Sequence, residues 1–154
     1  MRRAVFPGSF DPITRGHENI VRRAVALFDE IVVAVGSNSS KNSMFTLEQR
    51  LQWLNEVFQD EPKVRVDAYD GLTIDFCRKI EARFLLRGVR NGGDFEYERT
   101  IAQMTKYMAA DIETVIFFTD PEFAAINSTV VREILRNNGD VSIFLPPHIR
   151  IPKP

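Results

Sequence analysis

Hydrophobic and polar positions along the chain form two alternating patterns. Short runs rich in β-branched and aromatic residues predict strands at Ala4–Phe6, Ile31–Gly36, Val64–Tyr69, Phe84–Leu86 and Thr114–Phe118. Apolar residues spaced three and four apart predict helices over His17–Phe28, Leu47–Phe58, about Phe95–Met108 and about Ser128–Arg136. Several strand runs are apolar at consecutive positions, which is typical of parallel strands covered on both faces.

This alternation predicts one α/β domain over residues 1–154, built on an open, doubly wound parallel sheet of five strands. No internal repeat, low-complexity tract or linker interrupts the pattern. Ligands of such sheets bind beyond the carboxyl ends of the strands, where the strand order reverses. The loops after the strands are therefore the places to look for chemistry.

The loop after the first strand has the most specific composition. Gly8 allows a close backbone approach to a ligand, and Ser9 adds a hydroxyl beside it. Thr14 and His17 stand three apart where the first helix begins, next to unpaired N–H groups and the positive dipole end that attract phosphate. The pair also fits a structural N-cap followed by an ordinary first-turn residue, so the pattern alone leaves both interpretations open.

Cationic residues recur in the later loops. Lys41 lies in the polar loop after the second strand, and Arg87 and Arg90 frame Gly88 after the fourth. At the carboxyl edge of one sheet, these three cations are candidate phosphate ligands. Asp94, in the turn that follows, is a plausible cap of the third helix.

The segment before the last helix supplies two hydroxyls, those of Ser128 and Thr129. Simple capping of the helix explains them, and a second phosphate cradle explains them equally well. The sequence does not separate these two interpretations.

The composition narrows the function classes. With 20 basic and 21 acidic residues there is no overall field to attract nucleic acid or a membrane, so anion binding must be local. The glycine-rich dinucleotide fingerprint, the P-loop and Cys/His metal clusters are all absent from the sequence. We expect Cys77 to be a small buried hydrophobe and His148 a surface residue. Neither a signal-peptide core nor a membrane span is recognisable, so we expect a cytoplasmic location.

Four segments together resemble the bacterial phosphopantetheine adenylyltransferase family. They are Pro7–His17 (PGSFDPITRGH), Ser40–Arg50 (SKNSMFTLEQR), Leu86–Glu98 (LRGVRNGGDFEYE) and Ile126–Glu133 (INSTVVRE), in the family's order and spacing. The Thr-x-Gly-His element alone marks only the wider nucleotidylyltransferase superfamily. The resemblance implies a Rossmann-like fold and direct in-line transfer of the adenylyl group of ATP to 4′-phosphopantetheine. It also implies Mg²⁺ with the ATP, coenzyme A as a feedback ligand, and a homo-oligomer, usually a hexamer.

Carried over residue by residue, the resemblance assigns roles to the loop residues. His17 stabilises the transition state at the α-phosphate of ATP. Contacts to phosphopantetheine are implied for Ser9, Lys41, Thr73 and Arg87. Contacts to ATP are implied for Ser9, Phe10, His17, Gly88, Val89, Arg90, Glu98, Phe123, Ala124, Ala125, Ile126, Asn127, Ser128 and Thr129. No protein residue is assigned to the metal.

Three features depart from the family's pattern. Asn127 replaces a serine common in the fourth segment, and Thr105-Lys106 stands where an Asn-Arg pair is frequent. The tail Pro146–Pro154 is broken by prolines where many relatives continue into a helix. Two other functions also stay open. One is a small nucleotidylyltransferase acting on nicotinate mononucleotide or glycerol phosphate, and the other is a non-catalytic module that binds coenzyme A or a nucleotide.

Overall fold

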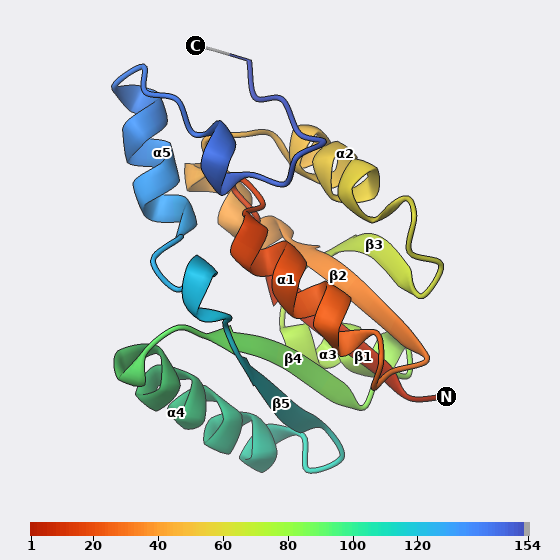
Figure 1. The fold of residues 1–154 in the computed structure, drawn as a ribbon. Helices are drawn as coiled ribbons and strands as arrows, with labels where there is room; N and C mark the ends of the chain where they lie inside the picture. The colour runs from red at the N-terminus through yellow and green to blue at the C-terminus, as the bar shows by residue number, and fades with distance from the viewer. Residues whose placement is uncertain (153–154) are drawn as a thin grey trace.

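The computed structural model describes residues 1–152, apart from the side chains of Ser39 and Ser40, so the last two residues of the proline-broken tail lie outside it. Five strands and five α-helices alternate along this part of the chain (Figure 1). The strands are β1 (Arg3–Gly8), β2 (Glu30–Gly36), β3 (Val64–Tyr69), β4 (Phe84–Val89) and β5 (Glu113–Phe118). The helices are α1 (Arg15–Ala24), α2 (Leu47–Phe58), α3 (Thr73–Lys79), α4 (Gly92–Met108) and α5 (Ser128–Arg136). Short 3₁₀ helices occupy Ser37–Asn42, Pro121–Phe123 and Ser142–Phe144.

The strands form one parallel sheet in the order β3-β2-β1-β4-β5. The chain runs from β1 outward through β2 to β3, then returns to the other side of β1 for β4 and β5. Val5 in the centre of β1 pairs with Val32 of β2 on one side and Leu85 of β4 on the other. The doubly wound α/β prediction is therefore confirmed, and the strand order reverses between β1 and β4.

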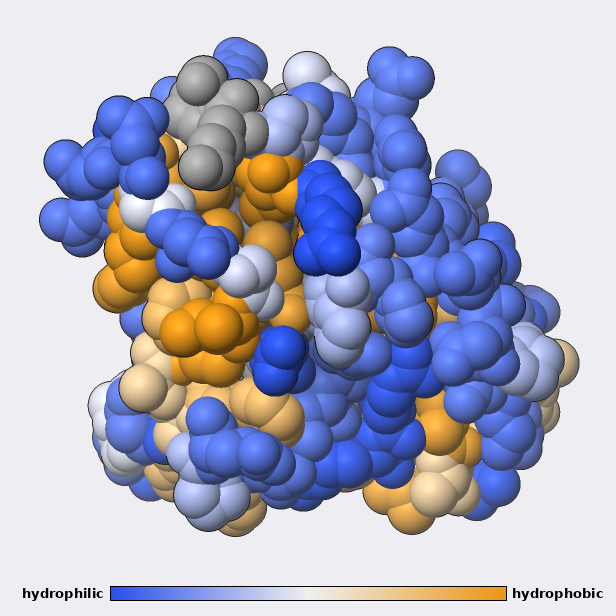
Figure 2. Space-filling view, turned by 45° about the horizontal axis from the view of Figure 1, so that its top comes forward, coloured by the Kyte–Doolittle hydropathy of each residue, from blue (hydrophilic) through white to orange (hydrophobic). Residues whose placement is uncertain are grey.

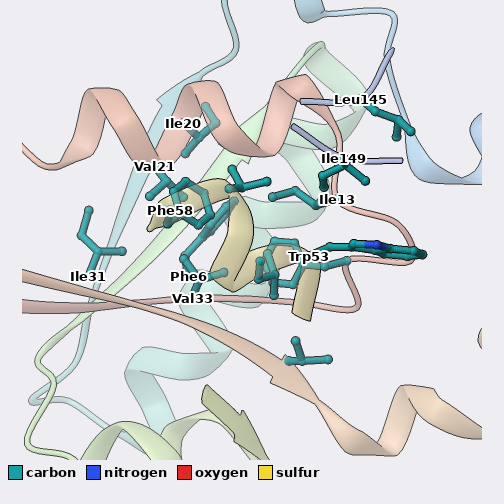
Figure 3. Packing of buried hydrophobic residues seen from close by; sticks show 14 of the residues in the cluster. Phe6, Ile13, Ile20, Val21, Ile31, Val33, Trp53, Phe58, Leu145 and Ile149 are labelled. Atoms are coloured by element: carbon teal, nitrogen blue, oxygen red, sulfur yellow. The ribbon is translucent and has the colours of Figure 1, made fainter. Parts of the chain in front are cut away.

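Alternating side chains of the strands build a core on each face of the sheet. On one face, Phe6 and Val33 contribute to a cluster completed by α1, α2, α5 and the C-terminal segment (Figure 3). Ile20 and Val21 of α1 and Trp53 and Phe58 of α2 point into this cluster, together with Leu145 and Ile149. On the other face, Val5 and Val32 pack with α3 and with the residues that follow α4. Cys77 is fully buried in this second core and His148 is exposed, as predicted.

Several element boundaries differ from the predicted ones. α1 runs over Arg15–Ala24 and not over His17–Phe28. β4 continues through Arg87 and Gly88 to Val89, because these residues stay in the hydrogen-bonded ladder with β5. The sequence had predicted Arg87 in the loop after the fourth strand, but Arg87 lies within β4. α3 was not predicted as a helix, since its buried residues Ile74, Phe76 and Cys77 span too short a stretch to show a helical period.

The helix α4 exposes its apolar face and buries polar residues. Its residues Tyr97, Ile101, Met104 and Met108 have helical spacing, yet they are 67%, 37%, 57% and 52% exposed. The residues that α4 buries are polar, Glu98 and Thr105. α4 lies along β4 and β5 at one edge of the sheet (Figure 1). The exposed fractions of the four residues show that the apolar face of α4 points away from the core. Within residues 1–152, no helix is both long and apolar enough to cross a membrane.

Candidate functional site

A cavity of about 450 Å³ opens at the carboxyl ends of β1 and β4, where the strand order reverses. The N-terminal ends of α1, α4 and α5 contribute to its wall. This is the position that the doubly wound topology predicts for a ligand. Of the predicted site residues, those that line the cavity are Ser9, Phe10, His17, Arg87, Gly88, Arg90, Glu98, Ile126, Asn127, Ser128 and Thr129.

His17 is held as a neutral imidazole. The backbone N–H of Thr14, the N-cap residue of α1, donates to His17 Nδ1 at 3.0 Å. Because Nδ1 accepts this hydrogen bond, the proton of the neutral ring sits on Nε2, which is then a donor. Burial, with the positive charges of Arg90 and then Arg87, lowers the pKa of His17 from its ordinary value of 6.5 to about 4. The two interpretations of the Thr14–His17 pair are thus compatible, since the helix cap itself orients the ring.

Aromatic rings support the loop that carries Ser9. The Phe10 ring packs edge-on against His17, with 5.1 Å between centroids, and is only 2% exposed. A Cβ on Gly8 would lie 3.1 Å from that ring. Tight packing against Phe10 is therefore a second reason for a glycine at position 8, besides the expected close approach of a ligand. Phe10 itself has a φ of 45°, a left-handed conformation that side chains rarely adopt.

Arg87 projects from β4 and is fixed by a bidentate ion pair. Its Nε donates to Glu98 Oε2 at 2.8 Å, and its Nη2 donates to Glu98 Oε1 at 2.6 Å. A third bond joins Arg87 Nη1 to the carbonyl of Pro7 at 3.1 Å. Glu98 is only 6% exposed, and both of its carboxylate oxygens are engaged by Arg87. Planar pairing of this kind holds the guanidinium in one orientation.

Arg90 is paired in the same manner but less deeply. Its Nε donates to Asp94 Oδ2 at 3.0 Å. The sequence had suggested Asp94 as the cap of α4, but Asp94 is the third residue of this helix. The cap is Asn91, whose Oδ1 accepts from the backbone N–H of Asp94 at 2.9 Å.

At the start of α5, the polar residues have separate partners. Asn127 is the N-cap, and its Oδ1 accepts from Val130 N at 2.8 Å. Ser128 Oγ donates to the carbonyl of Pro12 at 2.9 Å, which ties α5 to the first loop. Thr129 Oγ1 accepts from Arg132 Nη2 at 3.2 Å. Helix capping is therefore the role of Asn127 and not of Ser128 or Thr129.

Arg132 is a cavity residue to which the sequence reasoning gave no role. Its Nη1 donates to the carbonyl of Asp11 at 2.8 Å, and it lines the cavity with Arg87 and Arg90. Its position three residues after Thr129, at the start of a helix, was the available signal. The lining holds three arginines and the two carboxylates of Asp94 and Glu98, an excess of one positive charge. This surface suits a polyanion.

The remaining predicted residues do not line this cavity. Val89 is 1% exposed at the end of β4, and Phe123, Ala124 and Ala125 lie in and after the 3₁₀ helix before α5. Lys41 is exposed in the segment Ser37–Asn42, and Thr73 begins α3.

Lys41 and Thr73 belong to loops that meet each other beyond β2 and β3. Ser37 Oγ donates to the carboxylate of Asp70, and Asn38 Nδ2 donates to the carbonyl of Gly71 at 3.4 Å. These contacts place the Lys41 segment beside the turn that leads to Thr73. The site residues predicted from the sequence therefore fall into two regions.

The lining of the cavity contains two carboxylates, those of Asp94 and Glu98. Among the described residues, no group of three or more His, Cys, Asp and Glu side chains comes together. Asp94 and Glu98, which line the cavity, each pair with an arginine. Mg²⁺ commonly binds through substrate phosphates with few protein ligands, so these residues fit a metal that arrives bound to a triphosphate.

Comparison with known proteins identifies the family. Residues 5–134 match the family model described as cytidylyltransferase-like. The phosphopantetheine adenylyltransferase of Phocaeicola vulgatus is 50% identical over 151 residues, which cover 98% of this chain and 99% of that protein. The phosphopantetheine adenylyltransferase of Bacteroides fragilis is 47% identical over 146 residues, or 95% of this chain and 97% of the relative.

Solved structures share the fold at much lower identity. A putative nicotinate-nucleotide adenylyltransferase from Vibrio parahaemolyticus superposes with a TM-score of 0.68 at 18% identity, covering 96% of this chain and 95% of that one. A bifunctional NMN adenylyltransferase/ADP ribose pyrophosphatase from Francisella tularensis gives 0.72 at 16% identity, covering 94% of this chain and 44% of the larger protein. These likenesses show the Rossmann-like nucleotidyltransferase fold alone. The near-complete matches at about half identity go further, and the chain belongs to the phosphopantetheine adenylyltransferase family.

Proposed function

We propose that this protein transfers the adenylyl group of ATP to 4′-phosphopantetheine, giving dephospho-coenzyme A and pyrophosphate. The observation that carries the proposal is that His17, in the first turn of α1, lines one cavity with Arg87 and Arg90 at the sheet's switch point. The identity of the acceptor rests on the relatives. They match nearly the whole chain and are named for this activity.

The reaction asks the protein for placement and charge stabilisation. A phosphate oxygen of the acceptor attacks the α-phosphorus of ATP in line, a P–O bond forms, and the bond to pyrophosphate breaks. The acceptor phosphate is already an anionic nucleophile, so no general base is needed. The protein must bring two polyanions together and stabilise the charge that develops in the transition state.

His17 acts as a hydrogen-bond donor and not as a cation. With Nδ1 bonded to Thr14 N, its Nε2–H can donate to an oxygen of the α-phosphate. A neutral donor of fixed orientation stabilises developing negative charge and does not release its proton to the product. The N-terminus of α1 adds its own positive potential at the same point.

The arginines divide the remaining charge. Arg90 and Arg132 face the β- and γ-phosphates of ATP, and Arg87, fixed by Glu98, faces the acceptor phosphate. Lys41 and Thr73 extend the acceptor site along the loops beyond β2 and β3. Mg²⁺ bound with ATP would offset charge on the triphosphate.

A panel of acceptors tests the proposal. With ATP and Mg²⁺, pyrophosphate release should be fast with 4′-phosphopantetheine and slow with nicotinate mononucleotide or glycerol phosphate. Preference for either of the latter would establish a different nucleotidylyltransferase. Ligand binding without any pyrophosphate release would establish the non-catalytic module.

We also propose that coenzyme A binds in competition with the substrates, because it contains the pantetheine group that the acceptor site recognises. Calorimetric titration of the free enzyme with coenzyme A should give heat, and saturation with dephospho-coenzyme A should largely remove it. Heat that persists under saturation would require a separate coenzyme A site. The reaction consumes ATP, and we place it in the cytoplasm.

Finally, we propose a homo-oligomer, a hexamer by resemblance to the family. The exposed apolar face of α4, formed by Tyr97, Ile101, Met104 and Met108, supports association, since soluble monomers seldom expose such a stripe. Hydrophobic residues also gather on the left-hand part of the face in Figure 2, whereas hydrophilic residues cover most of its right-hand part. Light scattering should give a mass about six times that of the chain, and a monomer at micromolar concentration would contradict the proposal.

A further inference from the structure

Arg50 of α2 is a buried charge at the back of the first loop. Its side chain is 0% exposed, although arginine is among the residues least often buried. Nη1 donates to the carbonyl of Ser9 at 2.8 Å, and Nε makes a longer contact of 3.4 Å to the carbonyl of Thr46. Arg50 thus joins the cavity loop to the N-cap of α2.

Asp11 makes the reciprocal connection from the cavity loop. It is 3% exposed, and its carboxylate accepts from the backbone N–H groups of Met44 at 2.8 Å and Phe45 at 2.9 Å. Burial lowers the pKa of Arg50 from its ordinary value, and the negative charge of Asp11 opposes part of this shift. Asp11 and Arg50 together, here called the Asp11–Arg50 clamp, hold residues 9–11 against residues 44–46.

The clamp binds the backbone at Met44 and Phe45, close in sequence to Lys41. Only three residue steps separate Lys41 from Met44, a span of at most roughly 11 Å. Fixing Met44 and Phe45 therefore limits where the Lys41 segment can lie. On the other side, the carbonyl of Asp11 accepts from Arg132, which lines the cavity. The clamp therefore adjoins two half-sites, the cavity proposed for ATP and the Lys41 segment proposed for the acceptor.

Stability alone does not account for this arrangement. A buried charge is costly to desolvate, and an apolar residue of similar volume often serves a core as well or better. Arg50 Nη2 has no hydrogen-bond partner among the described residues, so the guanidinium is incompletely satisfied. What Arg50 provides, and an apolar residue would not, is a directed link from Ser9 to α2.

We propose that Arg50 is a positioning residue, which sets Ser9 of the nucleotide cavity at a fixed place relative to the segment that carries Lys41. The inference rests on the proposed function and on the contacts that the family resemblance implies, those of Ser9 with both substrates and of Lys41 with phosphopantetheine. Arg50 touches neither substrate. It keeps the two half-sites in register, so that the acceptor phosphate reaches the α-phosphorus of ATP.

Hydrogen exchange tests the link without relying on activity. In Arg50→Met, peptides covering residues 9–12 and 43–46 should exchange about tenfold faster than in the wild type, because the link between them is lost. Arg22→Met is the matched control. Arg22 also donates to a backbone carbonyl of α2, that of Val57 at 2.9 Å, but at the end of the helix away from the cavity. It should leave both peptides unchanged. Equal exchange in Arg50→Met and the wild type would overturn the proposal.

A double-mutant cycle tests the consequence for catalysis. If Arg50 acts through the Lys41 segment, Lys41→Ala should lower kcat/KM about tenfold in the wild type and less than about twofold in Arg50→Met. The same change should keep its full effect in Arg22→Met. Additive losses in Arg50→Met would show that Arg50 serves only the fold.

Arg50→Lys keeps the positive charge, and it replaces Arg50→Met in the cycle if Arg50→Met unfolds. It should show an intermediate loss, with a raised KM for the acceptor. Absence of pyrophosphate release by the wild type would refute the proposed function, and the exchange experiment would still decide whether the clamp exists.

Discussion

Two loops at the same edge of the sheet are held in contrasting ways. In the loop after β1, Phe10, Asp11 and Thr14 are all at most 3% exposed. It is bonded to α2 through Arg50 and to α5 through Ser128. The segment Ser37–Asn42 after β2 instead leaves Lys41 exposed, and its residues Ser37 and Asn38 bond to the turn at residues 70 and 71.

The difference assigns different tasks to the two loops. Stabilising a transition state requires donors that are already in place, and a buried, multiply bonded loop provides them. Recognising an extended acceptor tolerates an exposed lysine, which gains its phosphate contact on binding. Substitutions in the first loop should therefore act mainly on kcat, and substitutions in the second mainly on the KM for the acceptor.

The largest expected effect is that of removing His17. In His17→Ala, kcat and kcat/KM should fall together by about 10² to 10³, or roughly 3–4 kcal/mol, because the lost donor acts only in the transition state. Substrate affinities should change little. Steady-state kinetics and thermal melting of one preparation decide the matter. Normal turnover with early melting would assign His17 to the fold alone.

The second effect concerns acid stability. The pKa of His17 is lowered from 6.5 to about 4, so on acidification the unfolded chain takes up the proton first. The contribution of this pKa shift to the free energy of unfolding is complete above pH 6.5 and is lost as the pH falls towards 4. Urea melts at pH 7.5 and 4.5 should differ by about 2.5 kcal/mol more in the wild type than in His17→Gln. Between pH 5.5 and 8, kcat should show no ionisation of His17. A histidine step near pH 6.5 would contradict the neutral-donor role.

The two arginines of the cavity should separate the substrates. Arg87→Ala should chiefly weaken phosphopantetheine and Arg90→Ala chiefly ATP, each by roughly 1.5–3 kcal/mol for a lost charge-assisted contact. Calorimetric titration of each variant with each substrate measures this. Equal weakening of both substrates in both variants would remove the proposed division of charge.

The smallest effect is expected at the exposed loop. Lys41→Ala should raise the KM for phosphopantetheine about tenfold and leave kcat nearly unchanged, since the loss of one exposed phosphate contact should cost about 1.4 kcal/mol, the equivalent of a factor of ten. Arg23→Ala, an exposed cation of α1 paired with Asp120, is the matched control and should leave both constants unchanged. A large fall in kcat for Lys41→Ala would erase the contrast between the two loops.

The sequence by itself determined the fold class, most element positions and the motif residues that line the cavity. These follow from local signals: the period of the apolar residues, the turn chemistry of PGSFDP, and helix starts such as Thr46 with Gln49, which form a capping box in the structure. Such signals lie within a few residues of one another and need no knowledge of distant partners.

Only the tertiary structure decided how those residues are presented. The ladder with β5 keeps Arg87 in a strand, Glu98 orients it, and the carbonyl of Asp11 brings in Arg132. The outward apolar face of α4 and the low pKa of His17 likewise depend on which elements lie nearby and which do not. Pairings such as that of Asp11 with Met44 join residues far apart in the chain, and burial and charge are properties of the assembled surroundings, which no local pattern encodes.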